Sequence, residues 1–105
     1  MDKMQNEVYS SNLRGYTSAD LIFDLYKSLD EENRYNTKIK VKSSFHCNVV
    51  LLIEIYGHHY EIVFDLKENQ GYMKCLNGEI VWEGKRGGVL IYFNYLSISL
   101  KKTLI

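Results

Sequence analysis

The stretch FHCNVVLLIEIYGHHYEIVFDLK (residues 45–67) decides the expected fold. Apolar side chains recur at every second position through most of it, which is the period of a β-strand. We therefore expect one strand over residues 45–56 and a second over residues 59–67, joined by a tight turn at residues 57–58.

The turn sets the register of this hairpin. A tight turn pairs Ile55 with Tyr60, and it places the large apolar side chains on one face, as a buried sheet requires. The same register sets Glu54 opposite Glu61, a like-charge pair that needs a cation or solvent nearby. The first strand is apolar on its second face too, for example at Leu52, so we expect a central strand covered on both sides.

Three further strands flank this hairpin. Residues 35–42 alternate apolar or neutral side chains with lysines and form the first of them. Residues 72–76 and 79–83 are joined by Asn77-Gly78, the preferred type I′ turn, which would pair Met73 with Trp82 and Cys75 with Ile80.

The last expected strand covers residues 89–100. Its apolar phase slips by one residue along the strand, so we expect a β-bulge near Asn94 or Tyr95. The Gly-rich loop Gly84 to Gly88 precedes this strand. A phosphate-binding loop leads from a strand into a helix, so we interpret this one as a hairpin connection.

One helix is expected, over residues 17–33. Thr17 and Asp20 match the capping-box pattern. Apolar side chains recur at helical spacing along one face, namely Leu21, Ile22, Leu25 and Leu29. Three acids in the last turns oppose the helix dipole, so that end should fray or meet a cationic neighbour.

Together these elements predict one α+β domain over residues 1–105. It consists of an N-terminal arm (1–16), the helix (17–33) and an antiparallel β region (35–101), with the helix packed on a sheet of five to six strands. The length of 105 residues and the 46% apolar content suit a single folded domain.

The sequence contains no segment typical of export or membrane insertion. MDKMQNEVYSSN at its start lacks the apolar core of a signal peptide. The longest uninterrupted apolar run, Val49 to Ile53, is far shorter than the roughly 20 residues of a membrane helix. We therefore expect a cytoplasmic protein in which Cys47 and Cys75 are buried thiols on the core face.

The charge is balanced overall but segregated along the chain. Thirteen basic and thirteen acidic residues give a formal net charge of zero, which removes the simplest hint of a polyanionic partner. Residues 1–33 nevertheless carry −4, and residues 34–105 carry +4. The neutrality is thus a cancellation between an acidic helical segment and a basic sheet segment.

We find no catalytic, metal or cofactor signature. His58 and His59 are adjacent on a strand and would point to opposite faces. We therefore interpret them as exposed residues of a hairpin tip and not as an acid/base pair. The residues with ligand chemistry lack zinc-site spacing. They are His46, Cys47, His58, His59 and Cys75.

In size, Tyr- and Asn-rich composition and α+β pattern, the chain resembles the small immunity proteins that neutralise bacterial polymorphic or contact-dependent inhibition toxins. The resemblance implies a non-enzymatic protein that occludes the active or substrate-binding surface of a cognate toxin domain, typically a nuclease. Acidic residues of such inhibitors often meet a basic substrate groove. The expected contact residues are the acids Asp24, Asp30, Glu31 and Glu32, with the neighbouring Tyr26 and Tyr35 as interface anchors.

Two other hypotheses remain open. One is a small nuclease-like toxin or nucleic-acid binder that uses a basic face and His58 or His59 as an acid/base. That face comprises Arg34, Lys38, Lys40 and Lys42, although lysines also protect edge strands from aggregation, which argues against direct nucleic-acid binding. The other is an oligomerising module of a mobile element, and the sequence leaves open whether the protein is a monomer or a dimer.

Overall fold

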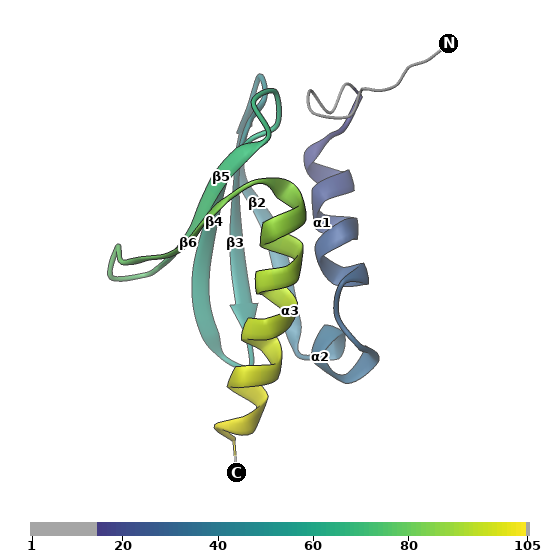
Figure 1. The fold of residues 1–105 in the computed structure, drawn as a ribbon, viewed down its shortest axis with the longest axis vertical. Coiled ribbons are helices and arrows are strands. Elements are labelled where there is room, and N and C mark those ends of the chain that lie inside the picture. The colour runs from purple at the N-terminus through teal and green to yellow at the C-terminus, as the bar shows by residue number, and fades with distance from the viewer. Residues whose placement is uncertain (1–14, 105) are drawn as a thin grey trace.

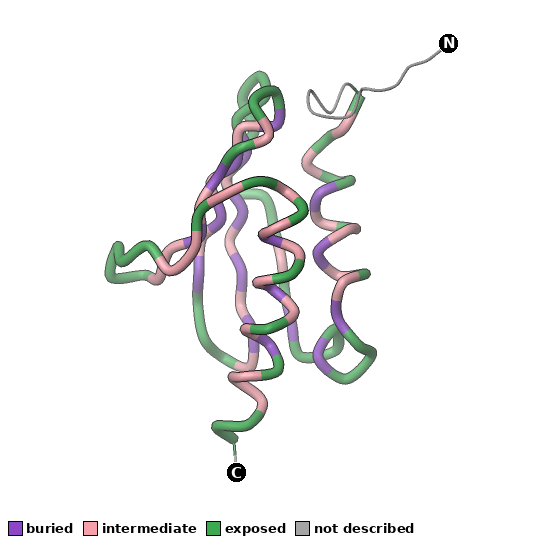
Figure 2. The backbone as a smooth tube through the Cα atoms, in the orientation of Figure 1, coloured by how far each residue is buried: buried purple, intermediate pink, exposed green. Residues whose placement is uncertain are grey.

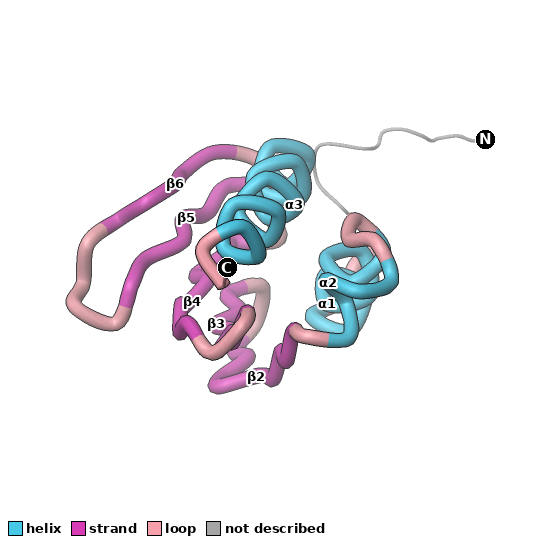
Figure 3. Tube along the Cα trace, turned by 90° about the horizontal axis from the view of Figure 1, so that it is seen from below, coloured by secondary structure: helices cyan, strands magenta, loops and turns pink. Residues whose placement is uncertain are grey.

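The computed structural model describes residues 15–104, so most of the expected N-terminal arm lies outside the described residues. The element order is α1 (Ser18–Lys27), α2 (Glu31–Tyr35), β2 (Thr37–Phe45), β3 (Asn48–Ile55), β4 (His58–Asp65), β5 (Gln70–Cys75), β6 (Ile80–Gly84) and α3 (Arg86–Lys102) (Figure 1). The five strands form one antiparallel sheet in the order β2-β3-β4-β5-β6. Viewed end-on, the sheet curves and all three helices lie on one side of it (Figure 3). The expected α+β class and antiparallel sheet are confirmed.

The last element is a helix and not the expected strand. Val89, Phe93 and Leu96 follow one another at intervals of four and three residues, which places them on one side of a helix. Val89 and Phe93 are fully buried there. The spacing that looked like a strand with a phase slip is therefore the spacing of a helix. It was mistaken for a strand because the segment is rich in β-branched and aromatic residues, which favour strands. The antiparallel region consequently ends at Gly84.

The expected helix over residues 17–33 is two helices. The capping box at Thr17 and Asp20 is confirmed, but α1 ends at Lys27. Asp30 then caps α2, because its side chain accepts a hydrogen bond from the backbone N–H of Asn33 (2.9 Å). The acids that would have opposed the dipole of one long helix thus lie in the first turn of a second helix, where the dipole favours them.

The β3–β4 hairpin turns one residue earlier than predicted. Tyr56 and Gly57 form the turn with φ of 49° and 82°, as a type I′ turn requires at both central positions. Ile53 therefore pairs with Tyr60, a shift of two residues that keeps every side chain on its predicted face. The predicted Glu54–Glu61 opposition is wrong, because Glu54 pairs with His59.

The other hairpins differ from prediction near bulges. Met73 pairs with Trp82 as predicted, but a register shift then pairs Ile80 with Lys74 instead of Cys75. A second shift, between Val41 and Ser43, lets β2 continue to Phe45 rather than stop before Ser43.

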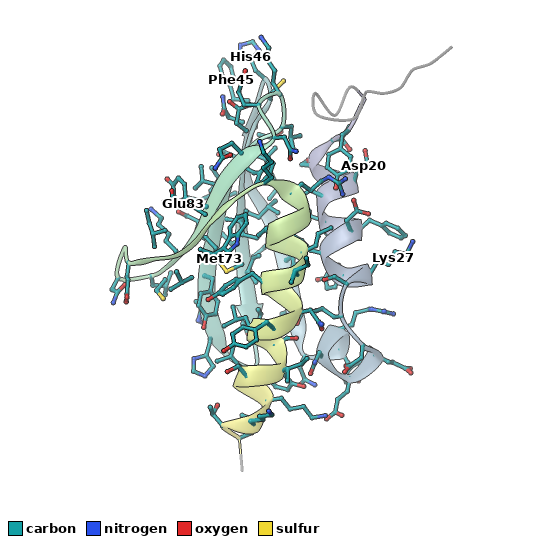
Figure 4. The ribbon with its side chains drawn as sticks, in the orientation of Figure 1. Asp20, Lys27, Phe45, His46, Met73 and Glu83 are labelled. Carbon is teal, nitrogen blue, oxygen red and sulfur yellow. The ribbon has the colours of Figure 1, made fainter. Side chains whose placement is uncertain are left out.

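The core lies between the helices and one face of the sheet. Buried positions alternate along the strands and recur on the sides of α1 and α3 that face them (Figure 2). Met73, for example, is fully buried between the sheet and α3 (Figure 4). Val50 and Leu52 lie on the opposite face and are only half-buried. The expectation that β3 is central and covered on both sides is therefore wrong; β4 is the middle strand.

A buried polar cluster fastens α2 to its neighbours. The Asn33 side chain, 1% exposed, donates to the Ser97 Oγ on α3 (3.2 Å) and accepts from the hydroxyl of Tyr56 after β3 (2.6 Å). Its backbone carbonyl accepts from the Thr37 hydroxyl at the start of β2 (2.7 Å). One residue thereby satisfies polar groups from three other parts of the fold, as burial requires.

Truncation of this side chain should be costly. We expect Asn33→Ala to lower the free energy of unfolding by about 2–3 kcal/mol, because it removes buried hydrogen bonds and leaves partners unpaired. Asn36→Ala, at an exposed asparagine of the same helix end, should cost less than about 1 kcal/mol. Urea unfolding monitored by circular dichroism measures both, and equal losses would contradict this role of Asn33.

Two glycines should respond oppositely to the same substitution. A Cβ at Gly71 would lie 2.3 Å from Cδ2 of Phe64 and 2.5 Å from the carbonyl oxygen of Val63, whereas one at Gly87 meets nothing within 4 Å. We expect Gly71→Ala to destabilise the protein by about 1–3 kcal/mol through overpacking. Gly87→Ala, in the first turn of α3, should stabilise it by less than about 1 kcal/mol. Thermal unfolding of both variants checks the signs.

Candidate functional site: an acidic corner at helix α2

Four of the six predicted partner-binding residues line one shallow hollow. They are Asp30, Glu31, Glu32 and Tyr35, and we call this group the acidic corner. The Tyr35 side chain is 91% exposed, the highest value among the exposed large hydrophobic residues of the described chain. Because the corner combines carboxylates with an exposed ring, it can offer both charge and contact area to another molecule.

The carboxylates of the corner differ in how far they are already engaged. Asp30 accepts the capping hydrogen bond of α2, and Glu32 accepts from the Lys101 ammonium of α3 at 2.6 Å. That hydrogen bond raises the pKa of Lys101. The Lys101 ammonium thus neighbours these acids at the start of α2, and not at the end of the single helix that the sequence predicted. Glu31 is exposed and forms no ion pair with any residue of the described range 15–104.

The other two predicted contact residues have structural partners. Asp24 accepts hydrogen bonds from the Tyr16 hydroxyl and from Arg86 (3.4 Å) on α3. Burial, followed by the hydrogen bond to Asp24, raises the pKa of Tyr16 well above its usual range. The Tyr26 hydroxyl accepts from the backbone N–H of Ile39 (2.9 Å) on the outer edge of β2. These two side chains hold elements of the fold together.

The predicted basic face is not one surface. The guanidinium of Arg34 donates to the carbonyl oxygens of Tyr26 (3.1 Å) and Leu29 (2.9 Å), so it caps the end of α1. Lys42 pairs with Glu61 at 3.0 Å. Lys38 and Lys40 form no ion pair within residues 15–104.

These two lysines line a hollow of about 710 Å³ against the sheet. Glu54, His59 and the exposed Leu76 also line it, and Nε2 of His59 lies 3.4 Å from a carboxylate oxygen of Glu54. His59 is thus paired with an acid at the surface, and His58 is exposed at the start of β4. The hollow offers two cations above an apolar floor.

The Gly-rich segment after β6 does lead into a helix, so its interpretation as a hairpin connection is wrong. Its glycines instead make room for an indole ring. A Cβ at Gly84 or Gly88 would lie 2.9 Å or 3.0 Å from Cζ2 of Trp82. Lys85 precedes α3 without a side-chain cap. Close packing on Trp82 therefore accounts for these glycines.

The cysteines and histidines do not assemble a metal site within residues 15–104. No group of three ligand-type side chains is present there. Cys47 is exposed in the β2–β3 turn and Cys75 is half-buried, so the expectation that both lie in the core is wrong. Both are free thiols.

Sequence reasoning missed one surface, the outward side of α3. Ile91, Tyr95 and Ile98 are exposed there. The available signal was the segment from Gly87 to Leu100, which contains no charged residue. It was interpreted as a strand, and its exposed positions were therefore not recognised.

No family model, curated protein or solved structure matches this chain. Within the described residues, no helix has the length and apolar character needed to cross a membrane.

The stability of the protein should depend on pH through Glu61, which lies on the sheet face away from the helices. The hydrogen bond from Lys42, with further help from Lys74, holds the pKa of Glu61 below its usual value, although burial opposes the shift. Its contribution is therefore present above the ordinary carboxyl pKa and is lost as the pH falls through the lowered value.

We expect Glu61→Gln to be about 1 kcal/mol or less below the wild-type protein in unfolding free energy at neutral pH, and equal to it in acid. Denaturant titrations at a series of pH values measure this difference. In a Lys42→Met background the substitution should cost less at neutral pH. A constant difference across the pH range would show that the carboxylate charge is not responsible.

Proposed function

We propose that the protein is a non-enzymatic, protein-binding inhibitor that acts in the cytoplasm as an immunity protein against a cognate toxin domain, typically a nuclease. The acidic corner is the proposed contact surface. The observation that carries the proposal is the Tyr35 ring, 91% exposed beside three carboxylates that line one hollow. Tyrosines in such positions commonly anchor protein interfaces.

Charge favours a basic partner surface. Glu31 is unpaired within residues 15–104, and Asp30 and Glu32 add negative potential on either side of the hollow. A nuclease domain keeps a basic groove for its substrate phosphates, and an acidic inhibitor can occupy that groove and speed association. The two remaining predicted residues, Asp24 and Tyr26, would contribute by holding α1 against α3 and β2.

The nucleic-acid alternative has weaker support. Two of its four predicted cations, Arg34 and Lys42, are engaged within the chain. The hollow beside Lys38 and Lys40 is also lined by the carboxylate of Glu54, which would repel the phosphates of a nucleic acid. Harmless overexpression of the chain in bacteria would count against a toxic nuclease activity.

The proposal is tested by co-expression with the protein encoded next to this chain in its native genome. We expect the chain to rescue growth from toxicity of that neighbour and to form a stoichiometric complex in isothermal titration calorimetry. Failure to bind and to protect would contradict the immunity function.

Two substitutions test the surface itself. Glu31→Lys should weaken binding at least tenfold and flatten its dependence on salt, because a favourable charge becomes a repulsive one. Tyr35→Ser should weaken binding by a similar factor without changing the salt dependence. Glu79→Lys, which makes the same charge change at the exposed β5–β6 turn, is the matched control and should bind like the wild type. Unchanged affinity for both corner variants would move the interface elsewhere.

A further inference from the structure

Helix α3 carries an exposed apolar stripe on the side away from the sheet. Ile91 is 75% exposed, Tyr95 64% and Ile98 41%, and intervals of four and three residues place them on one face. The opposite side of the same helix holds the fully buried Val89 and Phe93. The helix is therefore apolar on both sides, although the described chain covers only one of them.

The sequence of α3 is typical of a helix that is covered all round. From Gly87 to Leu100 it contains no charged residue. A surface helix normally turns charged or polar residues outward, and a helix that is apolar all round is normally buried. Contiguous exposed apolar side chains mark interaction surfaces. Because residues 15–104 leave the stripe uncovered, we expect it to be a contact surface.

We propose that a second copy of this chain covers the stripe, in a two-fold dimer whose α3 helices pack antiparallel with Tyr95 at the axis. A two-fold interface must be complementary to itself. Ile91 lies four residues before Tyr95 and Ile98 three residues after it, so an axis that passes beside Tyr95 sets Ile91 of each copy opposite Ile98 of the other. The spacing of the three side chains therefore suits self-pairing.

The distribution of charge fits the same occupant. A charged side chain near a two-fold axis meets its own like charge, and the central fourteen residues of α3 have none. Arg86 and Lys101, the first charges beyond this segment, are paired with Asp24 and Glu32 of their own chain. The remaining like charges of an antiparallel pair, Lys85 and Lys102, lie at its exposed ends, where salt screens them. The formal net charge of zero removes long-range repulsion between copies.

A lipid surface fits less well. A helix that lies on a membrane carries basic side chains along its polar face, whereas α3 has exposed lysines only at its two ends, Lys85 and Lys102. The same helix layer also carries the exposed carboxylates of Asp20, Asp30 and Glu31, which anionic headgroups would repel. The area also sets the expected strength. A helix of 17 residues is about 25 Å long, and one helix pair buries less than the roughly 800 Å² per partner of a standard interface. We therefore expect a weak dimer whose population rises with concentration.

Sedimentation equilibrium of the full chain, from low micromolar to near-millimolar concentration, tests the proposal. We expect the mass to rise from the 12.3 kDa monomer toward twice that value. Tyr95→Glu should remain monomeric throughout, because it sets two carboxylates against each other at the axis. Ile91→Lys is a second disruptive variant, and circular dichroism confirms that both variants keep the native helix content.

Phe23→Glu is the matched control, since Phe23 on α1 is also 64% exposed but lies outside the stripe. It should dimerise like the wild type. A monomeric wild type, a dimer that tolerates Tyr95→Glu, or equal dissociation by Phe23→Glu would each overturn the proposal.

Flotation with anionic phosphatidylserine vesicles separates the lipid alternative, because binding by a wild-type monomer that Tyr95→Glu abolishes would assign the stripe to a membrane. The inference does not depend on the acidic corner, and Glu31→Lys should leave dimerisation unchanged.

Discussion

The helix layer and the sheet depend on one buried asparagine for their alignment. Asn33 lies in a helix of five residues, too short to hold its place by its own hydrogen bonds. Its side chain reaches α3 through Ser97 and the end of β3 through Tyr56, and its carbonyl receives the hydroxyl of Thr37 as β2 begins. Apolar contacts alone would tolerate sliding between these elements, whereas directional bonds in a buried site define one arrangement. These hydrogen bonds therefore also fix the position of the acidic corner.

The strands could be predicted from sequence because a register error of two residues does not change which side chains face the core. A shift by two residues at the Tyr56-Gly57 turn left every strand face unchanged. The last element was not predictable in this way, since β-branched and aromatic residues in 89–100 suggested a strand while their spacing was helical. The break at residues 28–30 was missed because Leu29 continues the helical spacing of Leu21 and Leu25, and only the fold shows that Asp30 begins a second helix.

The candidate site was partly predictable for a related reason. Asp30, Glu31, Glu32 and Tyr35 are neighbours in sequence, so any local structure keeps them together. Asp24 was assigned to a surface, but it meets Arg86, which lies 62 residues further along the chain. Such long-range partners cannot be identified from one sequence. The ion pairs Asp24–Arg86 and Glu32–Lys101 each join the acidic N-terminal segment to the basic C-terminal helix. Part of the opposite charge of the two segments is therefore neutralised within the fold.

The order of strands in the sheet has a consequence for synthesis of the protein. Strands β2 to β6 follow one another in space as they do in sequence, so each hairpin can close soon after it leaves the ribosome. The apolar face of those hairpins, however, is covered by α1 and α3 together, and α3 follows all five strands in the chain. A nascent chain would therefore expose the part of the apolar sheet face that α3 covers until this helix has left the ribosome. During that interval the chain is a natural client for chaperones.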